Sequence, residues 1–357
     1  MGRNKSNFVD LCQGDFGRKT AYTGVAQITT ENVIQVLSDT IGTHNRNRMM
    51  INYLYRYYKG DQPILYREKL VRPEVNNRVV ENHALEVVKF KAGQIYGEPI
   101  QYVCKKKKAD KKINEQVDLL NDYLDEANAD ARNIQLGIYQ SAVGTAYKAI
   151  LREDDWTKDS DLPPFRIFIP YPGDVYIVYS KNTGKAMLSV QILKDEENQQ
   201  YYLCYSSNQY FKVKNGQVTV SGINGFDGIP IIEYPNNHDR LSDVEIAITA
   251  FDAINKYQSD RLNGVEQFVQ AFMKFKNCEI DENEFLKMVK LGAISVKDAG
   301  NGVQSDVDLM TAELNQSESQ VAKDDIYNNM LIVEAMPNRQ SNTGGDTGNA
   351  VYLRNGW

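Results

Sequence analysis

Apolar residues recur at helical spacing in the first part of the chain. In residues 30–59 they lie three and four positions apart, with a break near Gly42-Thr43, and Gly60 supplies a typical helix stop. The same spacing predicts a helix over residues 82–96 and two further helices within 113–141. We therefore expect the first part of the chain to be mainly helical.

The pattern changes to short aromatic and β-branched runs between residues 146 and 234. Turn residues such as Asn, Gly and Asp separate these runs, which predicts an antiparallel β-rich block. The predicted strands cover residues 146–151, 165–169, 175–179, 188–193, 201–205, 210–213 and 218–220. Residues 1–29 show neither pattern, so we expect an N-terminal arm that extends loosely from the fold.

A long apolar stripe follows the β-rich block. Ser242 and Glu245 have the spacing of a capping box, which marks the start of a helix. The stripe predicts a helix of about 35 residues, or ~50 Å at ~1.5 Å per residue. Its polar face includes Asn255 and Asn263. Such a helix suits either a core or a strut that shares its stripe with neighbours. The stripe consists of Leu241, Val244, Ile248, Phe251, Ile254, Leu262, Val265, Phe268, Phe272 and Phe275.

Shorter elements are predicted after this helix. We expect strands over 277–280, 293–296 and 307–310, with a short helix over 284–290. A helix over 317–334 comes next. Residues 339–348 then form a polar loop rich in Gly, Asn, Ser and Thr, and a further helix starts near 347–350.

Composition narrows the class of protein. Of the 357 residues, 42% are hydrophobic, which is enough for a core and excludes wholesale disorder. The formal net charge is −6, from 41 basic and 47 acidic residues, whereas proteins that read DNA sequence are usually basic. The chain begins with polar residues rather than a secretory signal and has no membrane-length apolar run. We therefore expect a soluble intracellular protein.

Residues typical of catalytic and metal sites are scarce. The four cysteines form no C-x-x-C pair, the three histidines lie far apart, and no phosphate-binding loop occurs. We therefore expect no cofactor and no metal. A dispersed acidic site stays open as an alternative, formed by Asp154, Asp155, Asp174 and Glu233. The basic run 104–112 is either a solvated loop or a contact for DNA or another acidic partner.

A set of short stretches, taken in order between residues 50 and 357, gives a further clue. They are Tyr-Tyr-Lys-Gly at 57–60, Asn77 with Asn82, Gly-Gln-Ile-Tyr-Gly-Glu-Pro-Ile at 93–100, Gly-Thr-Ala-Tyr at 144–147, Pro-Gly-Asp-Val at 172–175 with Tyr179, Gly-Ile-Pro-Ile-Ile-Glu-Tyr at 228–234, Asn236-Asn237, Ser242-Asp243, Asp-Ala-Ile-Asn at 252–255, Ser259-Asp260 and Thr-Gly-Asn-Ala at 347–350. This ordered set resembles the portal proteins of tailed bacteriophages, in the branch typified by long non-contractile-tailed phages of Gram-positive hosts.

The resemblance implies an α+β fold, that of an elongated portal subunit with a helical and β-rich wing, long stem helices and a small α/β clip. Family members continue past the last stem helix into a helical crown, so we expect the crown to be absent from this sequence. The implied parts are the wing at 30–235 (helical 30–145, β-rich 146–235), a stem helix at 236–276, the clip at 277–315, a second stem helix at 316–337, a tunnel loop at 338–349 and the start of a long helix at 350–357.

The resemblance also implies where function lies. The tunnel loop and its flank would face DNA through Arg339, Ser341, Asn342, Thr343, Gly344, Gly345, Asp346 and Arg354. The clip would dock partners through Glu284, Lys287, Lys290 and Lys297. The first stem helix would pack through Phe251, Leu262, Val265, Phe268 and Phe272.

The implied function is a non-enzymatic head–tail connector. Twelve copies would form a ring at one capsid vertex of the virion, after assembly in the host cytoplasm. Double-stranded DNA would pass through this ring during packaging and ejection. The implied partners are the terminase large subunit, the head–tail adaptor, and the major capsid and scaffolding proteins, with no membrane. An acidic chain suits such a channel, because many basic side chains in the bore would grip the phosphates.

Two alternatives stay open at this point. One is another ring-forming structural protein of the phage particle, although such adaptors are expected to be much smaller. The other is a metal-dependent nucleic-acid enzyme that uses the dispersed acidic residues.

Overall fold

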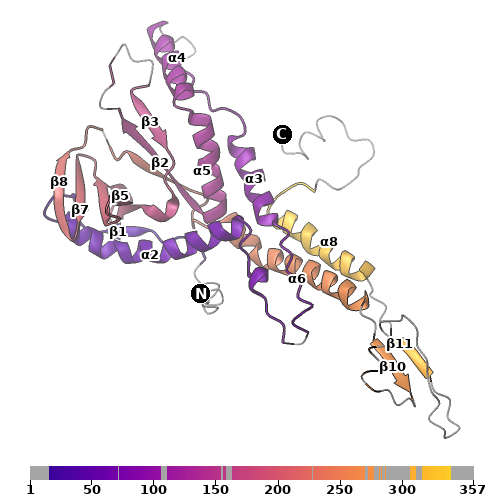
Figure 1. Cartoon of the computed structure of the whole chain (residues 1–357). Coiled ribbons are helices and arrows are strands. Elements are labelled where there is room, and N and C mark those ends of the chain that lie inside the picture. The colour runs from indigo at the N-terminus through magenta and orange to yellow at the C-terminus, as the bar shows by residue number, and fades with distance from the viewer. Residues whose placement is uncertain are drawn as a thin grey trace. The chain divides into compact units, whose positions relative to one another are not determined.

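The computed structural model describes residues 16–70, 72–105, 111–153, 156–157, 163–226, 228–269, 272–276, 281, 283, 286, 306–310 and 316–338. The chain divides into two compact units, each of which is treated by itself (Figure 1). The first unit contains Met1–Pro63, Glu81–Asp252 and Asn328–Trp357, and the second contains Ile64–Val80 and Ala253–Tyr327.

The helices of the first unit confirm the helical pattern read from the sequence. They are α2 (Val33–Tyr58), α3 (His83–Tyr96), α4 (Lys111–Glu126) and α5 (Ala129–Val143). The predicted break near Gly42-Thr43 is wrong, because α2 runs through it without interruption. A glycine inside a helix costs only ~1 kcal/mol, and the buried residues on both sides of Gly42 outweigh that.

The β-rich block forms two sheets rather than one. The larger sheet has the order β1-β4-β5-β6-β7-β8, antiparallel except for the parallel pair of β1 and β4. Its strands are β1 (Ala21–Thr23), β4 (Val175–Ser180), β5 (Ala186–Lys194), β6 (Gln200–Tyr205), β7 (Gln209–Lys214) and β8 (Gln217–Ile223). The smaller sheet is antiparallel, with the order β3 (Phe165–Phe168), β2 (Thr145–Arg152) and β9 (Ile231–Pro235).

Residues 16–28 do not form the loose arm expected from the sequence. Ala21 pairs with Val178 in the parallel β1–β4 ladder, and Ala21 and Ile28 are buried. A strand of three residues is too short to display an alternating pattern, so its place in the sheet is set by the neighbouring strand. Residues 1–15 lie outside the described residues.

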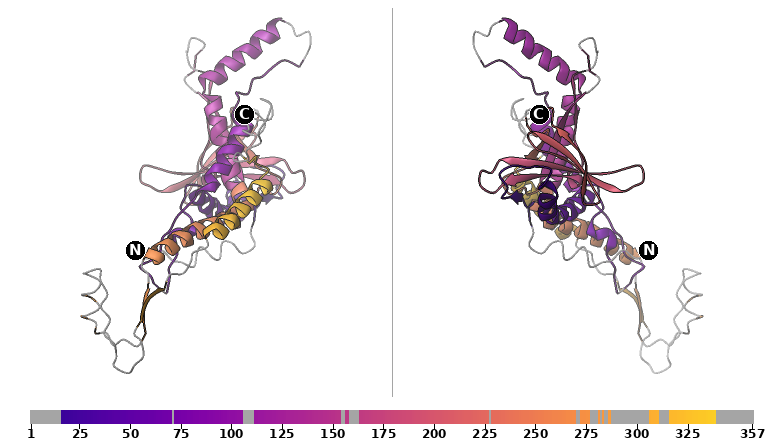
Figure 2. Two further views of the ribbon diagram at one scale, coloured as in Figure 1. Left: turned by 90° about the vertical axis from the view of Figure 1, so that its right-hand side faces the viewer. Right: turned by 90° about the vertical axis from the view of Figure 1, so that its left-hand side faces the viewer.

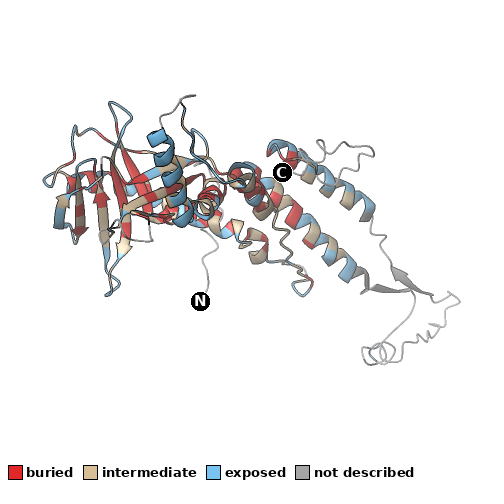
Figure 3. Ribbon diagram, turned by 90° about the horizontal axis from the view of Figure 1, so that it is seen from above, coloured by how far each residue is buried: buried red, intermediate tan, exposed pale blue. Residues whose placement is uncertain are grey.

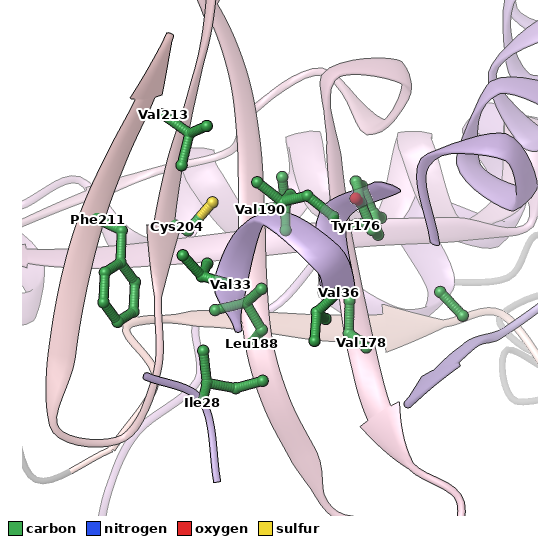
Figure 4. Packing of buried hydrophobic residues seen from close by; sticks show 12 residues of the cluster. Ile28, Val33, Val36, Tyr176, Val178, Leu188, Val190, Cys204, Phe211 and Val213 are labelled. Atoms are coloured by element: carbon green, nitrogen blue, oxygen red, sulfur yellow. The ribbon is translucent and has the colours of Figure 1, made fainter. Parts of the chain in front are cut away.

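Helix α2 covers one face of the larger sheet and forms the main core there. Figure 4 shows Val33 and Val36 of α2 among Val178 and Leu188 of the sheet, and all four are buried. Phe211 is also fully buried in this cluster. Burial of a side chain of this size contributes ~1.5–3 kcal/mol, so this layer supplies much of the stability of the first unit.

A second cluster joins the two sheets. Tyr147 and Ala149 of β2 and Ile231 of β9 pack against Val175 and Ile177 of β4. Helix α5 lies against α3 and β2, whereas α4 extends beyond the strands in both views of Figure 2 and has no buried residue. The sequence predicted these strands, but their division between two sheets depends on which residues pack across the layers.

Helix α6 (Asp243–Val269) is shorter than predicted. The expected stem helix 236–276 therefore ends at Val269, and Phe272 begins strand β10 (Phe272–Lys276) instead of continuing a helix. This strand pairs antiparallel with β11 (Asp306–Met310), and their register sets Lys274 opposite Asp308. Pairing of residue types of opposite charge with a distant segment favours a strand here, which spacing along one helix could not reveal.

Helix α8 (Gln316–Val333) confirms the helix predicted over 317–334. Figure 3 shows the buried positions of α6 gathered in a stripe along the helix. In the second unit this stripe consists of Ile254, Asn255, Ser259 and Asn263, all buried. The expectation that Asn255 and Asn263 lie on an exposed polar face is therefore wrong.

Candidate functional site

The start of α6 is fixed by a capping box, as the sequence predicts. The Ser242 Oγ accepts a hydrogen bond from the Val244 amide at 3.0 Å, and the Ser242 amide donates to Glu245 Oε2 at 2.9 Å. Ser242 is fully buried, and its hydroxyl also donates to the Ala142 carbonyl at 2.8 Å. The cap thus joins α6 to the C-terminal end of α5 as well as capping the N-terminus of α6.

Arg18 and Glu245 form a buried ion pair beside this cap. Their side chains are only 1% and 3% exposed. The Arg18 amide also donates to the Arg240 carbonyl at 3.2 Å. The Glu245 carboxylate of this pair also accepts hydrogen bonds from the Ser242 amide and the Gly17 amide, which offset part of the cost of burying its charge. The chain after residue 16 is thereby held at the first turn of α6.

Two glycines allow the turn before α6 to approach closely. A Cβ on Gly17 would lie 2.3 Å from the Asp239 carbonyl oxygen, and a Cβ on Gly144 would lie 2.1 Å from the Arg240 carbonyl oxygen. Both glycines also have positive φ, at +74° and +85°. Neither position accepts a larger residue without movement of backbone.

Glu233 on β9 is the centre of a second buried network. Arg240 donates to its two oxygens at 2.7 and 2.9 Å, Tyr179 Oη donates at 2.6 Å, and Thr145 Oγ1 donates at 2.9 Å. Burial alone would raise the pKa of Glu233, but the hydrogen bonds and charge of Arg240, with those of the two hydroxyls, outweigh burial and lower it. The Glu233 carboxylate therefore stays charged and rigidly held.

Tyr57 of α2 ties the middle of the first unit to α6. Its side chain is fully buried, packs near Phe251, and donates from Oη to Asp252 Oδ1 at 2.8 Å. Burial raises the pKa of Asp252, and the hydrogen bond from Tyr57 lowers it in part. Phe251, a predicted stem residue, thus packs inside its own subunit.

Lys91 of α3 holds the end of α8. Its ammonium donates to the Glu334 backbone carbonyl and lies 4.0 Å from Glu334 Oε2. The Glu334 side chain is 1% exposed, and its Oε1 has no hydrogen-bond partner among the described residues. Burial first, then the charge of Asp243, raises the pKa of Glu334 to about 7, against the opposing effect of Lys91.

In the second unit, residues 76–79 have no regular structure and are hydrogen-bonded to polar side chains in the buried stripe of α6. The Asn77 amide donates to Asn263 Oδ1 at 2.7 Å, and the Val79 amide donates to Ser259 Oγ at 2.9 Å. Arg67 pairs with Asp260 at 2.6 Å. Asn263 and Ser259 thus accept hydrogen bonds from backbone amides of a segment that has no regular structure, which explains why these two side chains are buried.

The other face of this half of α6 is partly open. Leu262 and Val265 are each 41% exposed, and Val321 of α8 is 69% exposed. Arg261 of α6 donates to Gln320 of α8. Single exposed apolar residues are ordinary, but a series of them along one pair of helices is typical of a surface that meets another chain. Phe268 lies in the last turn of α6, and nothing is described of its side chain.

All of the residues proposed to face DNA or to dock partners lie outside the described residues. This holds for the tunnel-loop residues Arg339, Ser341, Asn342, Thr343, Gly344, Gly345 and Asp346, for Arg354, and for the clip residues Glu284, Lys287, Lys290 and Lys297. No helix or strand is described at 277–280, 293–296 or 347–350, and within 284–290 the structure describes Leu286 alone, in helical conformation. These assignments stay predictions.

The dispersed acidic site is not assembled by the described residues. Asp174 pairs with Arg48 at 2.8 Å, and Glu233 is neutralised by Arg240. Asp154 and Asp155 lie outside the described residues. In the part of the chain that the structure describes, no group of three His, Cys, Asp or Glu side chains is placed to hold a metal ion.

Sequence reasoning missed the residues that hold the start of α6 and the end of α8 in place. Arg18, Arg240, Lys91 and Glu334 each find a partner far away in the sequence or across a turn, so local spacing carries no signal for them. Gly144 also fixes this region, and it does have a signal in the sequence, because it begins the Gly-Thr-Ala-Tyr stretch at 144–147. None of the described helices is long and apolar enough to span a membrane.

Comparison with protein families agrees with the resemblance seen in the sequence. The family model described as phage portal protein, SPP1 Gp6-like, matches residues 37–353. A solved structure titled "Neck of native GTA particle computed with C12 symmetry" is similar over 85% of this chain and 75% of that chain, with 12% identity and a TM-score of 0.47. A second, "Neck of empty GTA particle computed with C6 symmetry", covers the same shares with 11% identity and a TM-score of 0.48. No curated protein matches the sequence.

Proposed function

Because the chain belongs to the SPP1 Gp6-like family of phage portal proteins, we propose that its copies assemble into a closed ring at one vertex of a phage capsid. Twelve copies are the expected number, and double-stranded DNA passes through the ring during packaging and ejection. The observation that carries this proposal is the family match over residues 37–353, which spans the proposed wing, stem and clip together.

The stem helices support a ring built from side-by-side copies. Leu262 and Val265 of α6 are half-exposed in the single chain although they continue an apolar stripe. In a ring, a neighbouring copy would cover them. Because about two-fifths of each side chain is still exposed, covering it would contribute roughly 0.6–1.2 kcal/mol, repeated at every contact around the ring.

The clip and the tunnel loop supply the contacts with other molecules. Residues 277–315 dock the terminase large subunit during packaging and the head–tail adaptor afterwards. Residues 338–349 project toward DNA, where small polar side chains allow it to slide. The wing meets the major capsid and scaffolding proteins, so the protein acts in the virion after assembly in the host cytoplasm.

The role is structural rather than enzymatic, in keeping with the family. Energy for DNA translocation comes from the terminase, and the subunit supplies a channel and a platform. The described acidic residues support this view, because Asp174 and Glu233 are each occupied by an arginine.

Electron microscopy of the purified full chain tests the proposal. We expect closed rings with rotational symmetry and a solution mass that is a multiple of the subunit mass. A chain that stays monomeric at every concentration and hydrolyses DNA with a divalent metal would overturn it. Deletion of residues 341–346 is expected to leave the ring intact and to impair packaging, and normal packaging would remove the tunnel-loop assignment.

A further inference from the structure

The larger sheet ends in an open strand. Strand β8 is the last in the order of the sheet, beyond β7, and no other strand among the described residues pairs with its outer edge (Figure 1). Five of its seven positions are exposed. Val220 is 46% exposed and Ile223 is 85% exposed. The edge therefore presents apolar side chains as well as backbone.

The backbone groups that face outward can be identified. The Asn224 amide donates to the Asn208 carbonyl at 2.8 Å, directly after the register pair of Gln209 and Ile223. Because bonded and non-bonded positions alternate in an antiparallel ladder, Ile223 and Ser221 direct their amides and carbonyls away from β7. Two residues of β8 thus offer both donors and acceptors to an added strand.

The two edges of this sheet differ in how they are protected. The opposite edge, β1, is only three residues long. Strand β8 carries no charged residue and no proline over Gln217–Ile223, and its bulge lies near the turn, before Val220. An exposed edge strand can pair with a strand of another chain. Proteins normally prevent this with a lysine or a proline on the edge strand, or by making that strand very short. The stretch 220–223 lacks these devices.

A recess adjoins the end of β8. It has a volume of about 600 Å³ and lies between Ile223 and the loop that leads into α2, where Thr29 and Thr30 form part of its wall. An added strand would direct alternate side chains toward this recess. Backbone pairing then supplies affinity and the recess supplies side-chain selection, as in other cases of strand addition.

We propose that the outer edge of β8 binds residues 7–12 of a neighbouring copy as an added strand. This inference rests on the ring of the proposed function. Residues 7–12 read Asn-Phe-Val-Asp-Leu-Cys and form the apolar run among the residues before Phe16. The segment has one charge and strong strand formers, which fits an uncharged edge.

The position of the segment favours a neighbour over the same copy. Residues 1–15 join the fold just before β1, which is the opposite edge of the sheet from β8. A donor at one edge and an acceptor at the other make a head-to-tail contact, which closes into a ring when the rotation allows it. Only residues 13–15 separate the segment from Phe16, and this tether reaches ~13 Å when extended, which is less than the ~24 Å width of six strands ~4.8 Å apart.

Hydrogen exchange in assembled rings tests this contact. We expect amides of residues 7–12 and 220–223 to exchange at least about tenfold more slowly in the ring than in the unassembled chain. Deletion of residues 2–15 should restore fast exchange at 220–223. Ser221→Pro removes one outward amide and should release residues 7–12, whereas Ser221→Ala keeps that amide and the protection. Proline is tolerated where an edge amide faces solvent, so the sheet itself should persist.

The outcomes separate this inference from the proposed function. If the full chain forms rings in which residues 7–12 exchange freely, the inference is wrong and the ring stands. If 220–223 stay protected in rings of the deletion variant, another segment occupies the edge, which also overturns it. If the full chain forms no ring by mass, the proposed function fails, and this inference fails with it.

Discussion

Glu233 accepts both guanidinium hydrogen bonds of Arg240, at 2.7 and 2.9 Å, across the turn that precedes α6. The side chains are 4% and 16% exposed, so water does little to replace either partner. This pair fixes the geometry of the turn between β9 and α6. The geometry of this turn determines where α6 begins.

Removal of the Glu233 side chain should therefore destabilise the fold strongly. Glu233→Ala leaves the Arg240 charge buried without its partner, and we expect a loss of ~3–5 kcal/mol in unfolding free energy. Equilibrium unfolding in guanidinium chloride measures this loss in unfolding free energy. The matched control is Glu153→Ala, whose partner Arg166 is 63% exposed in its side chain, and there we expect a loss of ~0–1 kcal/mol. Equal losses at the two sites would contradict the role given to the buried pair.

Glu334 should make stability depend on pH. Its pKa is raised to about 7 in the folded chain, whereas an unfolded glutamate titrates near ~4.3. The folded state therefore holds the proton more tightly between these values, and the contribution of Glu334 to stability falls as pH rises from about 4.3 to about 7. The expected change is roughly 4 kcal/mol, at ~1.36 kcal/mol per pKa unit.

The measurement compares wild type with Glu334→Gln across this pH range. Glutamine keeps the shape of the side chain but cannot titrate, so the difference in unfolding free energy between the two proteins should vary with pH. A difference that stays constant from pH 4 to pH 8 would show that the Glu334 carboxyl titrates normally.

Gly144 should not accept alanine. The new Cβ would lie 2.1 Å from the Arg240 carbonyl oxygen, and φ is +85°. We expect Gly144→Ala to destabilise by more than ~3 kcal/mol, since backbone must move in addition to the strain of ~1–2 kcal/mol at positive φ. Gly184 is the control, because its φ is +68° but no atom lies within 4 Å of the added Cβ. Thermal unfolding should show a clearly smaller loss for Gly184→Ala.

Leu262 should matter for assembly rather than for folding of the single chain. Its side chain is 41% exposed, so Leu262→Asp leaves little unfavourable burial in the monomer. In a ring, the same aspartate would be buried at every contact, where an unpaired charge costs several kcal/mol. Sedimentation should show loss of rings, with the unfolding midpoint of the single chain lowered by only a few degrees, while Leu262→Met should assemble normally. Rings of normal mass from Leu262→Asp would remove Leu262 from the stem interface.

The order and type of most elements followed from the sequence alone, because short-range chemistry determines them. The 3.6-residue period over α2, α3 and α5, the alternation in the strands, and the capping box at Ser242 all depend on neighbours within a few positions. The ordered short stretches also led to the portal family, which the family match bears out.

Tertiary structure decided what depends on distant partners. The sequence predicted α6 as far as Phe275, but pairing with Asp306–Met310 turns residues 272–276 into a strand. Spacing along the helix suggested that Asn263 is exposed and Val265 hidden, yet the Asn77 amide binds Asn263 and leaves Val265 open. Arg18 meets Glu245 across more than two hundred residues. Hydrogen bonds and burial stabilise any contact that is close in space, whereas a pattern along the sequence indicates only contacts between residues that are near each other in the chain.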